Sequence, residues 1–485
     1  MPVAAKQAAL VNGERLDDAA RRRRTAELAM LVFAVGVVLA AEAIVETTQE
    51  GRVNAHLATY GLVPLAAGFI AHLIVRRFAP YADPLILPCV VFLNGLGLVM
   101  IRRLDVGEMM QARERGLDYG GDAAPSQVLW TAFGLIGFLA LLAIVRDHRV
   151  LQRYAYTLAL VGLFFLALPA VLPARFSEVN GARIWIRIAG FSIQPGEMAK
   201  ILLTIFGAAY LVAKRDVLSL AGRRFIGLEF PRGRDLGPLL LAWLLCIGVL
   251  IRGHDLGTSL MFFGLFVVLL YIATERASWV VLGLILFSGG AFLAYHLFAN
   301  VQVRVSVWLH VFDDANNTGY QVSQSLFGLG TGGLFGAGLG GGHPEIVPLP
   351  ATDFIITSFG EELGLFGLVA VLCVFGLLIA RGFSAALAVR DSFGKLLTAG
   401  LSFSLALQLF VVVAGVSRLL PETGLTTPFL SYGGSSLVAN YVLVALLLRV
   451  SDSARRPAVA TPVAASSPSL PPVLPVTPVT KGGAS

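Results

Sequence analysis

Residues 26–45 read AELAMLVFAVGVVLAAEAIV, an apolar run that begins almost directly after four consecutive arginines, Arg21 to Arg24. A helix needs about 20 residues to cross the hydrocarbon core of a bilayer, which is about 30 Å thick. The run is therefore long enough for one crossing. No small-residue cleavage site follows it closely, so the basic block and the run together predict a membrane anchor rather than a cleaved leader.

Eleven further apolar runs follow this one. Hydrophobic residues make up 56% of the 485-residue sequence and charged residues 14%, against about a quarter charged in an ordinary soluble domain. This composition excludes a soluble globule and predicts an all-α, polytopic integral membrane protein with about 12 transmembrane helices. The other predicted spans lie at about 56–75, 84–101, 128–145, 154–172, 195–213, 236–251, 256–274, 278–298, 359–380, 394–416 and 433–450.

The positive charges indicate how the chain is oriented. With the N-terminus inside, the inner segments hold 25 of the 37 Lys and Arg residues, and the outer side with its borders holds 12. Because short cytoplasmic loops carry an excess of Lys and Arg, this distribution predicts a multi-pass protein with both termini in the cytoplasm. The net charge of +7 then reflects orientation, and we expect no nucleic-acid partner.

The segments outside the spans divide into tails and outer loops. Residues 1–25 are polar, and residues 452–485 contain seven prolines, so we expect both tails to be cytoplasmic and disordered. The long loop 299–358 joins the ninth and tenth predicted helices on the outer, extracellular side, and loops of this length usually carry function. The shorter outer segments are 173–194 and 417–432.

The long loop contains Asp313 and Asp314, followed by Asn317 and Gly319. One interpretation is turn chemistry, because Asp and Asn side chains cap turns and tolerate left-handed backbone. The other is catalysis, because an aspartate with a pKa near 3.9 is ionised at neutral pH and can accept a proton or bind a cation. The residues by themselves favour the turn and leave catalysis open.

Nine glycines lie between Gly328 and Gly342. They lack the Gly-Lys-Ser/Thr ending of a phosphate-binding loop, so no nucleotide site is expected. Small residues let backbone segments approach closely, and close packing of an irregular segment is the first interpretation. The alternative is that exposed backbone N–H groups in this run hold a phosphate.

Charged residues near span ends are further candidates. Glu197 and Lys200 are three residues apart in QPGEMAK, so a helix places them on one face. They either form an ion pair that holds the bundle together or border a cavity for an anionic substrate, with Arg183 and Arg187 as phosphate-binding residues. Glu361 opens the tenth span, where a carboxylate also stabilises the helix N-terminus.

Five blocks occur in an order that resembles one known family. The blocks NGARIWIRIAGFSIQPGEMAK, HDLGTS, DDANNTGYQVSQSLFGLGTGGLFGAGLG, TDFIITSFGEELG and GLTTPFLSYGGSS span roughly 175–440. Their order is that of the shape, elongation, division and sporulation (SEDS) family, and the chain is more similar to its elongation-type members. Two local differences are Asp314-Ala315, where many members have Asp-Pro, and Gln194-Pro195-Gly196-Glu197, where the family has QPSE.

The resemblance implies a peptidoglycan glycosyltransferase in the bacterial cell membrane. Such an enzyme polymerises lipid II into glycan strands during cell elongation and releases undecaprenyl pyrophosphate. The family's catalytic aspartate lies five residues before the glycine of GYQ, which selects Asp314 as the general base of an inverting transfer. The substrate-binding residues that we expect are Arg183, Arg187, Glu197, Lys200, Tyr320, Gln321, Gln324, Glu361, Ser417 and Ser431.

The same resemblance suggests domains, cofactors and partners. The glycosyltransferase domain would cover 26–451, with the catalytic outer loop at 299–358 and an additional N-terminal helix pair within 26–101, because the family usually has ten spans. A divalent cation, Mg²⁺ or Mn²⁺, is a candidate cofactor without assigned ligands. The expected partners are lipid II, membrane lipids and a class B penicillin-binding protein that acts as a transpeptidase.

Two other functions fit parts of the pattern. Twelve spans with both ends inside are also a common transporter layout, and a lipid II flippase would use a similar cavity. However, a transporter predicts acids at the bilayer midplane and a repeat between the two halves, and most acids here lie at span ends. A scaffold without catalysis, which recruits the penicillin-binding protein, is the third hypothesis.

Overall fold

The structure is a computed structural model that describes residues 3–51, 56–117, 122–179, 182–188, 191–219, 223–225, 228–230, 237–252 and 256–456. Its contacts divide the chain into one large unit, Met1–Arg455, and the remainder, Arg456–Ser485. Of the predicted tail 452–485, residues 457–485 lie outside the described residues.

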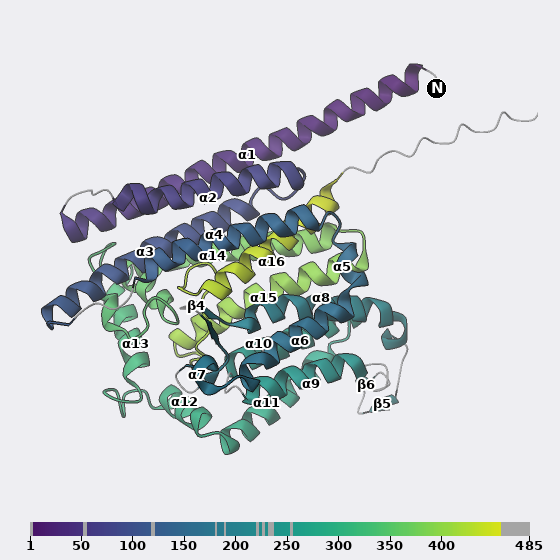
Figure 1. Cartoon of the computed structure of the whole chain (residues 1–485). Coiled ribbons are helices and arrows are strands. Elements are labelled where there is room, and N and C mark those ends of the chain that lie inside the picture. Colours follow the sequence, from purple (N-terminus) through teal and green to yellow (C-terminus); the bar gives the residue numbers. More distant parts are fainter. Residues whose placement is uncertain are drawn as a thin grey trace, which may run out of the picture. The chain divides into compact units, whose positions relative to one another are not determined.

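The large unit consists of helices (Figure 1). Those of the first half are α1 (Val3–Glu50), α2 (His56–Phe78), α3 (Ile86–Glu114), α4 (Ala123–Ile144), α5 (Arg149–Arg153), α6 (Ala155–Val171), α7 (Ala174–Ser177), α8 (Pro195–Ser219) and α9 (Gly237–Arg252). They are followed by α10 (Leu256–Thr274), α11 (Ser278–Leu297), α12 (Ala299–Leu309), α13 (Tyr320–Gly332), the 3₁₀-helix η2 (Pro344–Ile346), α14 (Ile355–Ala388), α15 (Ser392–Val416) and α16 (Gly434–Arg455).

Ten helices within the described residues are long and apolar enough to cross a membrane. They confirm the polytopic all-α prediction, and each coincides with a predicted span. The two remaining predicted spans, 154–172 and 236–251, are the helices α6 and α9 of 17 and 16 residues, so their crossing stays a prediction. The helix α1 begins at Val3, and residues 3–25 of the expected tail therefore continue into the first span without a break.

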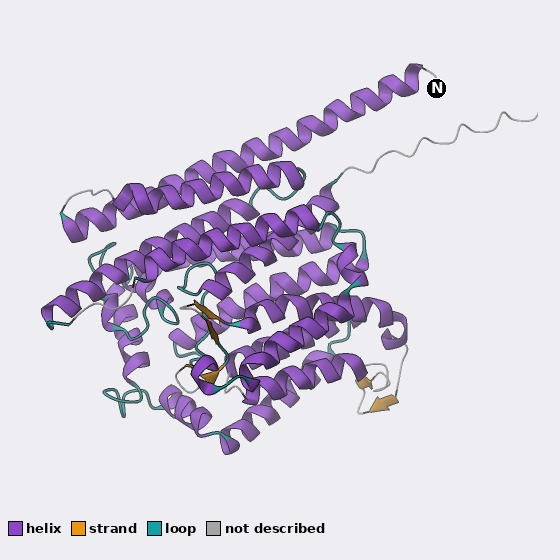
Figure 2. Cartoon of the chain, in the orientation of Figure 1, coloured by secondary structure: helices purple, strands orange, loops and turns teal. Residues whose placement is uncertain are grey.

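Among the described residues, three short antiparallel hairpins interrupt the helical pattern, and their strands are drawn as arrows in Figure 2. They pair Glu178–Val179 (β1) with Ala182–Arg183 (β2), Ile186–Ile188 (β3) with Phe191–Ile193 (β4), and Arg223–Phe225 (β5) with Leu228–Phe230 (β6). The sequence prediction had no strands. The pairing β3–β4 is explained by alternation, because β-branched Ile186, Ile188 and Ile193 alternate with polar neighbours.

The centre of the bundle lies around α3 and α16, because 94% and 83% of the residues in their most apolar stretches are buried. In contrast, 6% of the corresponding residues of α11 are buried. Gly134 of α4 allows Tyr441 of α16 to approach, since a Cβ at Gly134 would lie 2.5 Å from the ring. The Tyr441 hydroxyl accepts a hydrogen bond of 3.0 Å from Asn94 of α3. Three helices are thus fixed at one close contact, where dispersion and a satisfied buried hydroxyl both contribute.

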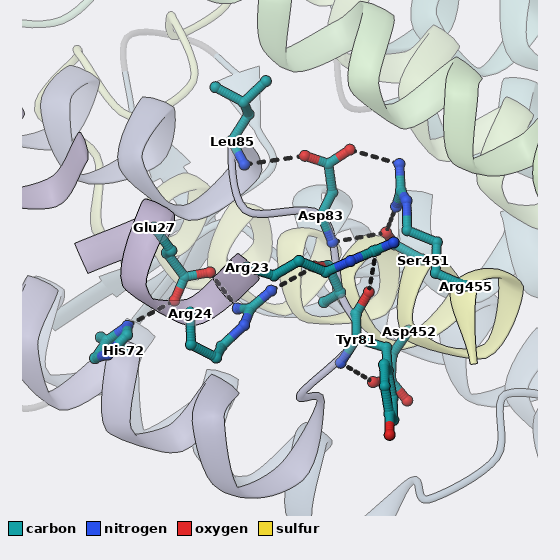
Figure 3. A network of polar contacts seen from close by, with 11 residues as sticks. Arg23, Arg24, Glu27, His72, Tyr81, Asp83, Leu85, Ser451, Asp452 and Arg455 are labelled. Atoms are coloured by element: carbon teal, nitrogen blue, oxygen red, sulfur yellow. Dashed lines mark hydrogen bonds and ion pairs between the residues drawn. The ribbon is translucent and has the colours of Figure 1, made fainter. Parts of the chain in front are cut away.

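A second contact, the Asp83 network, joins the segment before α3 to α14 and α16 (Figure 3). The fully buried Asp83 carboxylate accepts hydrogen bonds from Arg381 at 2.7 Å and from Arg455 at 2.6 Å. The backbone N–H of Asp83 donates to Ser451 Oγ at 3.0 Å. Asp83, three residues before α3, therefore holds α14 and α16 through its carboxylate and its backbone N–H.

We predict that Asp83→Asn lowers the free energy of unfolding by about 3–5 kcal/mol, because it leaves two largely buried guanidinium groups without their counter-charge. The measurement is thermal unfolding in detergent. Glu275→Gln is the matched control, because Glu275 pairs with Arg215 at 3.5 Å while both side chains are at least half exposed. That change is expected to cost less than about 0.5 kcal/mol. Equal unfolding midpoints for the two variants would contradict the role of Asp83.

Candidate functional site

The start of the long segment, residues 299–358, is anchored to the turn that follows α15 (Ser392–Val416). Arg418, which has a φ of +60°, donates to the carbonyls of Trp308 and Leu309 at 2.7 Å each. The indole N–H of Trp308 donates back to the Arg418 carbonyl at 3.1 Å. This reciprocal contact fixes the end of α12, from which the turn with Asp313 and Asp314 continues.

Asp314 lies in the turn between α12 and α13, where its carboxylate is held by its own turn. Asn317 Nδ2 donates to Oδ1 at 2.7 Å, and the N–H and hydroxyl of Thr318 donate to Oδ2 at 3.1 and 2.8 Å. Because these bonds stabilise the charged form, they lower the pKa of Asp314. Asp314 is thus an oriented, ionised carboxylate. The turn-capping interpretation is confirmed, and the catalytic one remains a prediction.

Glu197 and Lys200 form an ion pair at the start of α8, with Nζ and Oε2 2.9 Å apart and both side chains buried. Gln408 of α15 extends the pair, because its Oε1 accepts from Lys200 at 2.7 Å and its Nε2 donates to the Thr426 carbonyl at 2.9 Å. The ion pair is therefore present, and its predicted role beside an anionic substrate is not tested by these contacts. Its connection to Thr426 links it to the 417–432 segment.

The buried Ser431 fastens the 417–432 segment to the start of α14. Its hydroxyl donates to the Thr352 carbonyl at 2.5 Å and accepts from the Thr427 N–H at 2.8 Å. Its own carbonyl accepts from Gln127 of α4 at 3.2 Å. The Tyr432 N–H donates to the carbonyl of Ala351 at 2.7 Å. Ser431 therefore shapes the non-helical backbone beside the long segment.

A small recess, with a volume of about 10 Å³, opens between this segment and the end of α15. Its lining residues are Asp353, Phe354, Val412, Gly415, Val416, Glu422, Thr423, Gly424 and Leu425. Burial and the nearby charge of Glu422 raise the pKa of Asp353 to about 6, against the smaller opposing effect of Arg304. Asp353 therefore titrates near pH 6, above the usual range of an aspartate.

The glycine segment, residues 328–342, packs against α14. The N–H groups of Ala337 and Gly338 donate to the carbonyls of Glu361 and Glu362 at 2.9 and 3.0 Å. The Gly340 N–H donates to the Glu362 carboxylate at 2.9 Å. Since these donors are occupied, the structure supports the close-packing interpretation of the glycines and not the phosphate-holding one.

Arg103 of α3 completes this contact from the other side. Its side chain, 2% exposed, donates to Glu362 Oε1 at 2.7 Å, to Glu345 Oε2 at 3.2 Å and to the Gly342 carbonyl at 2.6 Å. Glu361 Oε1 accepts from the N–H of His343 at 2.7 Å. Glu361 thus holds the glycine segment, and its predicted role in substrate binding is not tested by this contact.

None of the other predicted residues makes a hydrogen bond to Asp314 among the described residues. Arg183 pairs with Glu178 at 3.0 Å, and Arg187 is exposed and donates to the Glu178 carbonyl at 3.1 Å. Ser417 ends α15 and donates to the Val413 carbonyl at 2.7 Å. The remaining three lie on the first turns of α13: Tyr320 is exposed, Gln321 donates to the Pro348 carbonyl at 3.1 Å and Gln324 is partly buried.

Within the described residues, no group of three or more His, Cys, Asp or Glu side chains is arranged to hold a metal ion. A protein-held Mg²⁺ usually rests on one or two carboxylates together with substrate phosphates. The described residues therefore do not form a metal site by themselves, and the divalent cation stays a prediction.

Several residues of this region were not singled out as site residues by sequence reasoning. Gln408 lies inside the predicted span 394–416, and Arg103 lies two residues beyond the predicted span 84–101. Ionisable or amide side chains in a membrane span are costly unless they are partnered, and that cost was the available indication. Asp353 and Arg418 lie in the segments 299–358 and 417–432, which were predicted as outer segments. Their roles depend on partners such as Glu422 and Trp308 that are distant in sequence.

These features define an integral membrane protein of many helices, in which polar side chains gather where two non-helical segments meet the start of α14. Residues 83–456 match the FtsW, RodA and SpoVE model of cell cycle proteins. The chain belongs to this family, the SEDS family that its ordered blocks resemble. The family match begins after α2.

Curated relatives match most of the chain. It is 54% identical over 435 residues to the peptidoglycan glycosyltransferase RodA of Mycobacterium tuberculosis strain H37Rv, covering 90% of this chain and 92% of that protein. It is 35% identical over 384 residues to a probable peptidoglycan glycosyltransferase FtsW of Geobacter sp. strain M18, covering 79% and 99%.

Solved structures share the fold. A chain of a peptidoglycan synthase complex, described as coordinating polymerization and crosslinking, has a TM-score of 0.59 at 26% identity and covers 76% of this chain and 98% of its own. The rod shape determining protein RodA of Thermus thermophilus has a TM-score of 0.52 at 26% identity, covering 76% and 96%.

We predict that Gly364→Ala destabilises the glycine segment by at least about 2 kcal/mol. Gly364 has a φ of +66° inside α14, and a Cβ there would lie 2.3 Å from the N atom of Gly336. Limited proteolysis of residues 328–342 and thermal unfolding measure the effect. Gly376→Ala on the same helix is the control, because no atom lies within 4 Å of its Cβ position. Equal protease resistance of both variants would show that the Gly364 contact is dispensable.

Proposed function

We propose that the chain is a peptidoglycan glycosyltransferase that polymerises lipid II during cell elongation. The observation that carries this proposal is the 54% identity, over 92% of its length, to a relative named peptidoglycan glycosyltransferase RodA. The oriented Asp314 carboxylate in the long segment supports it, because the family resemblance assigns the catalytic acid to that position.

In the proposed reaction, Asp314 is the general base. It accepts the proton of the 4-hydroxyl group of the acceptor GlcNAc while that oxygen forms a bond to the anomeric carbon of the donor MurNAc. The bond from this carbon to the pyrophosphate oxygen breaks, its electron pair leaves with undecaprenyl pyrophosphate, and the configuration is inverted. Asn317 and Thr318 support this role because they orient the carboxylate and keep it ionised.

The other predicted residues would bind substrate around this base. Arg183, Arg187 and Lys200 are cations for the pyrophosphate, whose charge grows during the transfer. The list of proposed binding residues is completed by Glu197, Tyr320, Gln321, Gln324, Glu361, Ser417 and Ser431. A divalent Mg²⁺ or Mn²⁺ would supply further positive charge at the pyrophosphate when bound.

We also propose twelve crossings, with α6 and α9 as the two short ones, and both termini in the cytoplasm. The proposed domains are then the tails 1–25 and 452–485 and the glycosyltransferase domain 26–451, whose long segment faces outward. A class B penicillin-binding protein is the proposed partner. The similarity to a chain of a solved peptidoglycan synthase complex supports this proposal.

We predict that Asp314→Asn abolishes glycan polymer, because the amide cannot accept the proton. Purified protein, the transpeptidase partner and lipid II are incubated with Mg²⁺ or with EDTA, and the products are separated by size. Asp313→Asn is the matched control, since Asp313 is the exposed neighbouring acid, 3.6 Å from His310. Equal polymer from both variants would exclude the proposed base. Movement of lipid II across vesicles without polymer would instead support a flippase.

We predict a pH effect from Asn317→Ala. This change removes the largest cause of the lowered pKa of Asp314, so the pKa rises and the base becomes protonated at a higher pH. The acid limb of the kcat/KM profile for polymerisation therefore moves to higher pH, while the rate at neutral pH changes less. Asn316→Ala is the control, because Asn316 makes no hydrogen bond to Asp314 among the described residues. An unmoved acid limb in Asn317→Ala would contradict this assignment.

A further inference from the structure

The helix α1 lies outside the family match, which begins at residue 83, yet it is joined to α3 by buried charges. Glu42 and Glu46 are both fully buried and face Arg102 of α3, whose Nη1 hydrogen-bonds Glu42 and lies 3.2 Å from Glu46 Oε1. The Arg102 guanidinium also lies 5.1 Å from the ring centroid of Tyr60 of α2. Both N-terminal helices therefore contact the same arginine.

The next residue, Arg103, connects this contact to the glycine segment. It binds Glu362, Glu345 and the Gly342 carbonyl, as described above. With its amide oriented so that the oxygen faces Arg103, Gln49 of α1 accepts from Nε and Nη1 at 2.9 Å. The side chain of Thr48 lies against Gly340, within 3.1 Å of the Cβ position there. The last turns of α1 thus contact both the arginine and the segment that it holds.

We propose that the final turns of α1, through Glu42, Glu46 and Gln49, position the glycine segment for the proposed polymerisation by fixing Arg102 and Arg103. The substrate contacts would come from the long segment, and α1 would act through Arg103 rather than on the sugar. This inference rests on the proposed function and assigns a role to the additional N-terminal helix pair. Arg103 is the positioning residue, because it carries contacts from α3 to η2, α14 and the glycine segment.

The opposite end of the apolar span within the same helix, Ala20–Gln49, provides a comparison. Near its first span residues, Glu27 is fully buried, accepts a hydrogen bond from Arg24 and lies 2.7 Å from His72 of α2 (Figure 3). Arg24 also donates to the Ala82 carbonyl. This contact has the same chemistry as that of Glu42 and Glu46, but none of its partners belongs to the glycine segment. A substitution that weakens the Glu27 contact therefore shows whether a general loosening of α1 is enough to affect the glycine segment.

The test compares the full-length double variant Glu42→Gln/Glu46→Gln with Glu27→Gln by amide hydrogen exchange and by glycan polymerisation. We expect exchange at Ala337, Gly338, Gly340 and His343 to accelerate by about tenfold or more in the double variant and to stay near that of the parent in Glu27→Gln. We expect kcat for polymer to fall in the double variant with a smaller change in KM. Gln49→Ala, which keeps the buried carboxylates, is the second variant if the double variant does not fold, with the same expected direction.

Two outcomes would overturn the proposal. One is unchanged exchange in the glycine segment of the folded double variant or of Gln49→Ala. The other is equal acceleration in Glu27→Gln, which would mean that α1 only contributes general stability. Hydrogen exchange needs no substrate, so its result stands even if the parent protein makes no polymer, and failure of the proposed function is thereby distinguished from failure of this inference.

Discussion

The buried ion pair between Arg103 and Glu362 is the interaction on which the long segment depends. A buried guanidinium group is tolerated only when its charge is paired and its N–H donors have acceptors. For Arg103, the carboxylates of Glu362 and Glu345 and the carbonyl of Gly342 provide both. The glycine segment itself then contributes close backbone packing and hydrogen bonds to α14. The irregular part of the chain is therefore ordered by a charge located on a regular helix, α3.

Sequence reasoning reached the architecture through local patterns. Apolar runs placed the spans, because each span is readable within about 20 residues, and the spacing of Glu197 and Lys200 predicted their shared helix face. It missed the hairpins, which are only two or three residues per strand, and the close helix contact at Tyr441. Strands of two or three residues are too short for their alternation to be read as a pattern, and contacts between helices leave no pattern in the local sequence.

The candidate site was predictable only in part. The Asp314 turn has local chemistry, since Asn317 and Thr318 follow within four residues and bind the carboxylate. In contrast, Arg103 and Glu362 are 259 residues apart, and their pairing needs the packing of the whole bundle. The structure therefore explains how the Asp314 carboxylate is held. Its proposed role as a base toward a sugar hydroxyl rests on the family resemblance.

The exchange of backbone hydrogen bonds between the glycine segment and α14 also has an evolutionary consequence. Leu365 and Phe366 donate to the carbonyls of Gly333 and Leu334, and Ala337 and Gly338 donate to Glu361 and Glu362, so the two stretches meet in a fixed register. An inserted or deleted residue inside either stretch would shift every later bond by one position. Insertions and deletions are therefore expected to be tolerated poorly inside either stretch.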